Sequence, residues 1–317
     1  MSEKTIGYSD VIGKMKKNKI TAIGEILFDI YPEKKRLGGA PFNFIYHIWK
    51  INGKANFISG VGDDENGNEI LSYLNSTGFN TKYIKIDVEH PTGTVHVKLR
   101  EDKTPQFIIS SESSGDFLEL NESIDQLIKS QTDLLYFGTV SQRNKTTRSS
   151  INSLLGKPIK YFCDLNLRHN FYTKNIIETA LIASNIVKVN EDELNIISKE
   201  IYESDPGSNF LIQKIIQDFK IDLLCVTRGE NGATLITKND VDTYKINLPD
   251  PVDTLGAGDA YAAILCLGYL NNLPLKEINI IANRFAADIC MVDGAIPAED
   301  SIYSDYCKIF ASINQTD

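Results

Sequence analysis

The sequence predicts an α/β fold with a mainly parallel central sheet that is flanked by helices. Short apolar segments of strand length alternate along the chain with longer helical patterns. Strands that are separated by helices pair in parallel, because each helix carries the chain back across the sheet. One stretch breaks this rhythm, because residues 94–100 alternate strictly between polar and apolar side chains and lead through a polar turn to a second short strand. This stretch predicts an antiparallel hairpin in a small sheet outside the main one.

The pattern also predicts the order of the elements. We expect residues 1–18 to be a disordered lead and residues 19–317 to form one domain. The predicted main-sheet strands and the helices are, in chain order, a strand at 20–30, a helix at 41–51, a strand at 55–60, a helix at 66–76, strands at 134–140, 161–165 and 186–189, a helix at 209–219, a strand at 223–227, and helices at 260–270 and 280–292. The small sheet is expected from segments near 28–37 and 92–115. An edge hairpin of the main sheet is the alternative.

Composition excludes several classes of protein. With 317 residues, 42% of them apolar and 24% charged, the chain can bury a sizeable core. The formal net charge of −9, with both signs mixed, argues against a nucleic-acid or anionic-membrane surface but not against a nucleotide substrate. No stretch approaches the ~20 apolar residues of a transmembrane helix. The five cysteines lie far apart and mostly in apolar runs, so we expect reduced core residues in a cytoplasmic protein.

The most informative segment is 253–259, Asp-Thr-Leu-Gly-Ala-Gly-Asp, which precedes an apolar helix. At this helix start the backbone N–H groups of Gly256, Ala257 and Gly258 and the positive end of the helix dipole suit an anion. Asp259 would repel a phosphate that is merely bound, but it suits phosphoryl transfer, where a base takes the proton of the attacking hydroxyl. The alternative is that the glycines open a helix that Asp259 caps.

A second glycine segment lies between a predicted strand and a predicted helix. Gly38 and Gly39 let the backbone approach a ligand, and Asn43 offers both a donor and an acceptor to neighbouring hydroxyls. The alternative is a strand-to-helix turn with Pro41 at the first helical position. Residues 227–233, Thr-Arg-Gly-Glu-Asn-Gly-Ala, are an ordinary hairpin turn when taken alone.

Polar side chains also follow two predicted strands, at the end where open α/β sheets bind ligands. Asn166 and Arg168 follow the strand at 161–165, and the planar fork of Arg168 suits paired phosphate oxygens. Asn190 and Glu193 follow the next strand, where oxygen ligands suit Mg²⁺ directly or through water. A surface arginine and an acidic first helical turn are the alternatives.

Taken in order, these segments resemble the motifs of the ribokinase-like (PfkB) carbohydrate kinases over roughly residues 21–297. The matching motifs are Gly24-Glu25-x-x-x-Asp29, Gly38-Gly39-x-x-x-Asn43, Asp164-x-Asn166-x-Arg168 with Leu165 in place of the family's proline, Asn190-x-x-Glu193, Thr227-x-Gly229-x-x-Gly232, and the segment from Asp253 to Asp259. A segment at 59–67 resembles a further family motif and is expected to have a positioning role. The four histidines are expected to have none.

The resemblance implies a ribokinase-like fold in which the small sheet closes over a sugar as a lid and forms a homodimer contact. It implies ATP-dependent phosphorylation with Asp259 as general base, an anion hole from the N–H groups of residues 256–258, each worth about 3–4 kcal/mol, and Arg168 as added positive charge. The implied sugar ligands are Asp29, Gly38, Gly39, Asn43, Asn166 and Asp259. The implied nucleotide ligands are Asn190, Thr227, Gly229, Gly232, Gly258 and Asn283. Glu193 is implied for Mg²⁺, directly or through water, and Asp253 for a monovalent cation such as K⁺.

The Gly-Gly-Ala-Pro sequence at 38–41 looks most like the fructokinase branch, so D-fructose is the preferred acceptor and fructose 6-phosphate the product. The alternatives are a 2-keto-3-deoxygluconate kinase, a ribokinase or a nucleoside kinase and, in a different class, a non-catalytic sugar or nucleotide sensor. A phosphorylated acceptor is disfavoured, because no extra basic cluster lies near the sugar motifs. A nucleotide-dependent oxidoreductase is also disfavoured, because Tyr261 stands where a dinucleotide fingerprint has its third glycine. The expected partners are thus a small sugar and ATP, with no nucleic acid and no membrane.

Overall fold

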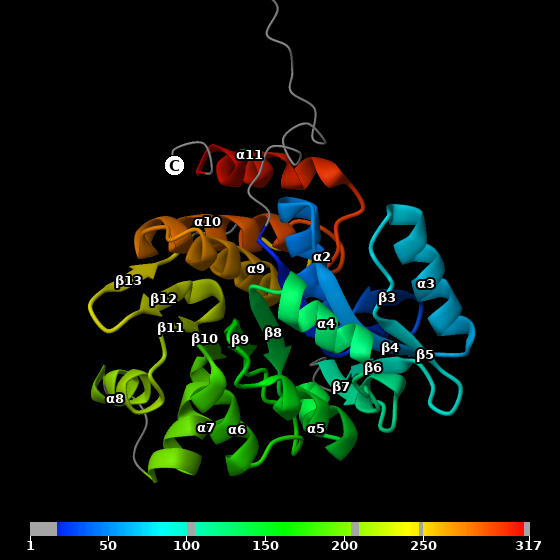
Figure 1. Ribbon diagram of the computed structural model, residues 1–317. Coiled ribbons are helices and arrows are strands. Elements are labelled where there is room, and N and C mark those ends of the chain that lie inside the picture. Colours follow the sequence, from blue (N-terminus) through cyan, green and yellow to red (C-terminus); the bar gives the residue numbers. More distant parts are fainter. Residues whose placement is uncertain (1–17, 100–104, 204–208, 247–249, 314–317) are drawn as a thin grey trace, which may run out of the picture.

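The computed structural model describes residues 18–99, 105–203, 209–246 and 250–313, and it shows a large sheet with helices on both faces (Figure 1). The large sheet has nine strands in the order β13-β12-β11-β10-β9-β8-β1-β4-β5. Neighbouring strands are parallel, except that β12 is antiparallel to both β11 and β13. The predicted α/β class with a mainly parallel sheet is therefore confirmed. Nearly all of the predicted lead at 1–18 lies outside the described residues.

The strands of the large sheet are short and mostly apolar. Their bounds are β1 (Ile20–Ile23), β4 (Asn56–Gly62), β5 (Ile84–Asp87), β8 (Leu134–Gly138), β9 (Lys160–Asp164), β10 (Ile186–Asn190), β11 (Leu223–Thr227), β12 (Ala233–Ile236) and β13 (Val241–Tyr244). Successive side chains of a strand point to opposite faces of the sheet. In β8, for example, Leu134 and Tyr136 belong to one hydrophobic core, and Leu135 and Phe137 belong to the other.

Helices cover both cores, which explains why the central strands read as continuous apolar runs. One face carries α2 (Ala40–Asn52), α3 (Glu65–Thr77), α9 (Ala257–Leu270), α10 (Leu275–Cys290) and α11 (Ser304–Ile313). The other carries α4 (Glu122–Gln131), α5 (Lys145–Leu154), α6 (Lys174–Ala183), α7 (Glu191–Tyr202) and α8 (Asn209–Phe219). The 3₁₀ turns are η1 (Ser114–Asp116), η2 (Val140–Gln142), η3 (Gly229–Asn231) and η4 (Asp300–Tyr303).

A separate small sheet has four strands in the order β3-β2-β6-β7. Its strands are β2 (Leu27–Ile30), β3 (Lys35–Gly38), β6 (Gly93–Leu99) and β7 (Pro105–Ile109). The antiparallel pairing of β6 with β7 confirms the predicted hairpin, and β2 and β3 complete its sheet as expected. The alternative of an edge hairpin in the main sheet is thereby excluded. The turn of the hairpin at 100–104 lies outside the described residues.

The prediction of a single strand over 20–30 is wrong. The chain leaves the main sheet after Ile23 and enters the small sheet at Leu27. Gly24 has a φ of 154°, and a Cβ at this position would lie 2.5 Å from Cγ of Pro41 and 2.7 Å from Oγ of Ser141. A glycine therefore turns the chain where a side chain does not fit, although the apolar pattern continues on both sides of the turn.

This turn places the small sheet above one edge of the main sheet. The strands β1, β8, β9, β10 and β11 are parallel, so their carboxyl ends lie at one edge, and β2 begins shortly after β1 ends. Ligands of open α/β sheets bind outside the carboxyl ends of the strands. The residues expected to form a site are therefore those that follow these strands.

Two further expectations concern burial and membranes. All five cysteines are free and buried, as expected for core residues. Within the described ranges, no helix is long and apolar enough to cross a membrane.

One buried histidine predicts a pH effect on stability. The Nδ1 atom of His47 lies 2.9 Å from the hydroxyl of Tyr303, and burial lowers the pKa of His47 from 6.5 to about 3. Because the pKa of His47 is depressed in the folded state, His47 binds a proton near pH 6.5 only when the protein is unfolded. The free energy of unfolding therefore falls as pH drops below 6.5.

We therefore expect the free energy of unfolding of the wild type to fall more steeply between pH 6.5 and 5 than that of His47→Gln. The expected difference in slope approaches about 1.4 kcal/mol per pH unit. Urea unfolding of both proteins at several pH values measures it. Equal slopes would show that His47 does not link folding to protons.

Candidate active site

A cavity of about 1070 Å³ lies at the carboxyl edge of the main sheet. Its walls come from both sheets: Asp164, Lys188 and Thr227 line it from the main sheet, and Asp29 and Val95 line it from the small sheet. The cavity therefore lies where two sheets meet, and it is large enough for more than one small molecule.

One wall of the cavity is the start of α9. Gly256 precedes this helix with a φ of 78°, and a Cβ at this position would lie 2.3 Å from Cβ of Ala295. Only glycine fits such a left-handed position pressed against a neighbouring loop. In the described part of the chain, no acceptor takes the N–H group of Gly256 or of Gly258. Both residues line the cavity, so two backbone donors are available there to an anion.

Asp259 stands beside these donors, in the first turn of α9. One of its oxygens, Oδ2, accepts a 2.8 Å hydrogen bond from Nδ2 of Asn43, and the side chain stays partly exposed to the cavity. Burial, reinforced by the charge of Asp164, raises the pKa of Asp259 from 3.8 to about 7. A carboxylate with such a pKa is suited to accept a proton near neutral pH. The Oδ1 atom of Asn43 is buried and has no partner among the described atoms.

A buried ion pair lies beneath the start of α9. Nζ of Lys188 donates to both carboxylate oxygens of Asp164, at 2.9 and 2.7 Å, across the neighbouring strands β9 and β10. Burial alone would lower the pKa of Lys188, but Asp164 raises it, so the amine stays charged. A Cβ on Gly258 would lie 3.5 Å from this Nζ, which puts the positive charge next to the free N–H groups. Lys188 was given no role from the sequence, although its lone charge in the apolar strand 186–189 was a usable signal.

The wall formed by the small sheet holds Asp29. Its Oδ2 would lie 2.6 Å from a Cβ on Gly38, so the absence of a side chain at Gly38 makes room for this carboxylate. Burial raises the pKa of Asp29 to about 6, although Arg36 opposite in the sheet lowers it. Gly39 also lines the cavity, with a φ of 107°, and a Cβ there would lie 2.6 Å from the carbonyl oxygen of Glu25.

Glu193 and Asn190 form a reciprocal cap at the start of α7. Oδ1 of Asn190 accepts the N–H of Glu193 at 2.8 Å, and Oε2 of Glu193 accepts the N–H of Asn190 at 2.8 Å. The other Glu193 oxygen accepts the N–H of Leu167 at 2.9 Å. Both residues line the cavity, so the cap fixes polar groups at its edge.

Arg168 and Asn166 are brought to the cavity together. Nε of the exposed Arg168 donates to Oδ1 of Asn166 at 2.8 Å, and Asn166 has a φ of 46°. His169, to which the sequence analysis gave no role, also lines the cavity. Thr227 lines it at the end of β11.

Three predicted nucleotide ligands are not among the residues that line this cavity. Gly229 and Gly232 form the turn after β11, where a Cβ on Gly232 would lie 2.0 Å from the carbonyl oxygen of Tyr244. Asn283 is buried in α10, where its Nδ2 donates to the carbonyl oxygen and to Oδ1 of Asn279 at 2.8 and 2.9 Å. In this geometry Gly229 and Gly232 shape the turn, and Asn283 makes a contact within α10.

Asp253, predicted to hold a monovalent cation, already has several partners. Its Oδ1 accepts the N–H of Leu255 at 3.0 Å, and its Oδ2 accepts the N–H of Gly294 at 3.1 Å. Nη1 of Arg36 donates to the same Oδ2. A guanidinium from the small sheet thus neutralises this carboxylate.

Two carboxylates of the cavity, those of Asp164 and Glu193, are already engaged by other groups. Among the described residues, no group of three or more His, Cys, Asp or Glu side chains is arranged to hold a metal ion. Asp164 is taken by Lys188, and both oxygens of Glu193 accept backbone N–H groups. This donor set fits Mg²⁺ that is held mainly by phosphate oxygens and water.

Comparison with known proteins decides the family. The model of the pfkB family carbohydrate kinases matches residues 18–301. The chain belongs to the pfkB family of carbohydrate kinases. The predicted family and the predicted class of enzyme are therefore confirmed.

Individual relatives agree with this assignment. The chain is 28% identical over 322 residues to Arabidopsis thaliana "Probable fructokinase-7", with 89% of this chain and 90% of that protein covered. A Pyrococcus horikoshii sugar kinase in complex with ATP has a TM-score of 0.74 at 24% identity, with 87% of this chain and 93% of that chain covered. A double mutant of Vibrio cholerae fructokinase, bound to fructose, ADP and potassium ion, has a TM-score of 0.75 at 22% identity, with 91% and 98% covered. The structural likenesses show that this kinase shares their ribokinase-like fold.

The loop before α9 yields a test with a matched control. Gly256 and Gly156 have φ values of 78° and 85°, but a Cβ on Gly156 would meet no atom within 4 Å. The left-handed backbone alone costs an alanine about 1–2 kcal/mol at either position, and at Gly256 the clash with Ala295 adds to this cost. We expect Gly156→Ala to lose only that stability, and Gly256→Ala also to lose turnover by about 100-fold, because the N–H donors are displaced.

Thermal unfolding and ADP release of both variants measure these effects. Normal turnover of the Gly256→Ala variant would contradict the role given to this loop.

Proposed function

We propose that this kinase transfers the γ-phosphoryl group of ATP to a hydroxymethyl group of a neutral sugar, with D-fructose as the preferred acceptor and fructose 6-phosphate as the product. The observation that carries the proposal is the position of Asp259. Its carboxylate, with a pKa raised to about 7, lies beside the free N–H groups of Gly256 and Gly258 in one cavity. A base and an anion hole at one point are what phosphoryl transfer to an alcohol requires.

In this proposal Asp259 takes the proton of the attacking hydroxyl, and Asn43 holds the carboxylate in place through its Nδ2. The free N–H groups of Gly256 and Gly258 stabilise the charge that develops on the transferred group, whereas the N–H of Ala257, which was also predicted, donates to the carbonyl oxygen of Thr254 at 3.4 Å. Lys188 adds a fixed positive charge beneath them, and Arg168 adds one at the cavity mouth. Mg²⁺ bound with the nucleotide would neutralise phosphate charge, with Glu193 reaching it through water.

The charge of the sugar wall supports an uncharged acceptor. The carboxylates of Asp29 and Glu25 line this part of the cavity with Asp259. The guanidinium of Arg36 is engaged by Asp253 and Asp293. A carboxylate or phosphate on the acceptor would meet like charges here, whereas hydroxyl groups can donate to all three acids. This favours fructose over 2-keto-3-deoxygluconate, and the fructokinases among the relatives support the same choice.

We propose that the nucleotide contacts Asn190, Thr227 and Gly258, which line the cavity. Contacts from Gly229, Gly232 and Asn283 would require a different arrangement of these residues. K⁺ at Asp253 stays a prediction, because Arg36 already pairs with that carboxylate. Closure of the small sheet as a lid, a homodimer through it and a cytoplasmic location also stay predictions.

The role of Asp259 predicts a separation of turnover from binding. In Asp259→Asn the amide can still accept from Asn43 but cannot take up a proton. We expect turnover with fructose to fall by about 10²–10⁴-fold, while the affinities for fructose and ATP change by no more than severalfold. ADP release and isothermal titration measure the two effects, with the exposed Asp250→Asn as the control. Unchanged turnover in Asp259→Asn would contradict the proposal. A non-catalytic sensor would instead keep its function nearly unaffected by this substitution.

The choice of acceptor is tested with a panel of fructose, ribose, adenosine and 2-keto-3-deoxygluconate. We expect the highest kcat/KM with fructose and at least a tenfold lower value with the anionic 2-keto-3-deoxygluconate. A preference for the anionic sugar would show that the carboxylates of this wall do not face the acceptor. A preference for ribose or adenosine would keep the neutral acceptor and replace fructose.

A further inference from the structure

We propose that Glu25 is a further acceptor ligand, which binds a sugar hydroxyl, and that Arg143 positions it from outside the cavity. The inference rests on the proposed function and concerns a residue of the first motif, in which the resemblance implied Asp29, but not Glu25, as a sugar ligand. Glu25 lies in the turn that carries the chain from the main sheet to the small sheet, between Ile23 and Leu27. It is the residue at which the two walls of the cavity join.

Glu25 shares a cavity with the proposed base. Glu25 lines the main cavity together with Asp29, Asn43 and Asp259. Its charge is among the causes that raise the pKa of Asp259, so the two carboxylates lie within electrostatic reach of each other. An acceptor whose reacting hydroxyl meets Asp259 can therefore bring another hydroxyl to Glu25 within the same cavity.

The Glu25 carboxylate has hydrogen-bonding capacity to spare. The hydroxyl of Ser141 donates to its Oε2. Across the described ranges, this is the one donor that another residue's side chain supplies to Glu25. An ionised carboxylate can accept about four hydrogen bonds, and burial without partners is costly. The hydroxyl of a bound sugar would donate a further hydrogen bond to Glu25, which the other described side chains do not supply.

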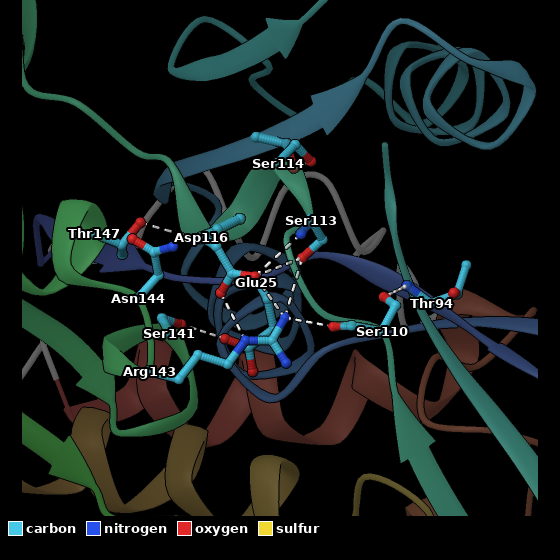
Figure 2. Close-up of polar contacts among 12 residues, drawn as sticks. Glu25, Thr94, Ser110, Ser113, Ser114, Asp116, Ser141, Arg143, Asn144 and Thr147 are labelled. Atoms are coloured by element: carbon cyan, nitrogen blue, oxygen red, sulfur yellow. Dashed lines mark hydrogen bonds and ion pairs between the residues drawn. The ribbon is translucent and has the colours of Figure 1, made fainter. Parts of the chain in front are cut away.

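The surroundings of Glu25 hold it in place (Figure 2). Arg143 lies near it but does not line the main cavity, and its Nε and Nη2 donate to the two oxygens of Asp116, both at 2.7 Å. The positive charge of Arg143 lowers the pKa of Glu25, whereas burial, the larger effect, raises it. Ser141, two residues before Arg143, donates directly to the carboxylate, so one short segment both holds Glu25 and places a positive charge near it.

The same arginine ties the small sheet to this point. Its Nη2 also donates to the carbonyl oxygen of Ser110 at 2.6 Å and to Oγ of Ser113 at 3.3 Å. Ser110 follows β7 directly, where the chain leaves the small sheet, and its Oγ accepts the N–H of Thr94 in β6 at 3.0 Å. Figure 2 shows these residues gathered around Glu25 and Arg143. A displacement of the small sheet would therefore move Arg143 and alter the setting of Glu25.

The competing explanation is that Glu25 only fastens the turn through Ser141. Glu25→Gln separates the two, because the amide oxygen still accepts from the hydroxyl but the negative charge is gone. Glu119→Gln is the matched control, since Glu119 is exposed and outside the cavity. We expect the KM for fructose to rise at least about tenfold in the Glu25 variant, as for a lost charge-assisted hydrogen bond, with the KM for ATP changed less than twofold.

An unchanged KM for fructose in Glu25→Gln, or an equal rise in both KM values, would overturn the inference while leaving the proposed function intact. Failure of the wild type to turn over or bind fructose would overturn the proposed function and this inference with it.

Arg143→Lys keeps the positive charge but loses the planar guanidinium that donates to both oxygens of Asp116. We expect it to raise the KM for fructose severalfold with kcat nearly unchanged, whereas a loss confined to kcat or to stability would contradict a positioning role.

Deoxy sugars provide the sharpest form of the test. Binding of fructose and of its monodeoxy analogues to the ADP complex is measured for the wild type and for Glu25→Gln. The analogue that lacks the hydroxyl bound by Glu25 should bind the wild type about as weakly as fructose binds Glu25→Gln. The Glu25→Gln substitution should then weaken the binding of this analogue little further. Additive losses for every analogue would show that Glu25 holds no acceptor hydroxyl.

Discussion

The ion pair between Asp164 and Lys188 is the interaction on which the rest of the site depends. It joins neighbouring parallel strands at their carboxyl ends and places one charge of each sign beneath the start of α9. Asp164 raises the pKa of Asp259 and Lys188 lowers it, and burial leaves the result near 7. Loss of either partner would leave an uncompensated charge in a buried place. The pair therefore sets both the local geometry and the proton affinity of the proposed base.

The second constraint is the turn at Gly24, which sends the chain from one sheet into another. Because β2 rises above the carboxyl edge of the main sheet, the cavity receives a second wall that carries Asp29 and Glu25. The two walls differ in charge: the free N–H groups of Gly256 and Gly258 and the amine of Lys188 lie on one, and the carboxylates of Asp29 and Glu25 lie on the other. In the proposed function this division would place the transferred phosphoryl group at the first wall and the hydroxyls of the acceptor at the second.

The sequence was sufficient for features that are encoded locally. Asp259, Gly256 and Asn43 were found because each lies at a fixed spacing from glycines at a helix start. Lys188 was missed because its importance depends on which strand lies next to β10, which spacing along the chain does not encode. The strand predicted at 20–30 was wrong because the apolar pattern runs on through the turn at Gly24. Asn283 was assigned by resemblance alone, and the structure buries it against Asn279.

The most direct test of this account is the pH dependence of kcat/KM for fructose at saturating MgATP, in the wild type and in Asp164→Asn. The account predicts a rise with pH to a plateau, with an apparent pKa near 7, because only ionised Asp259 accepts the proton. In the variant this limb should move to lower pH, since the neighbouring negative charge is gone and Lys188 is unopposed. A profile that is flat from pH 5 to 9, or a limb at the same pH in both proteins, would contradict Asp259 as a base poised by this buried pair.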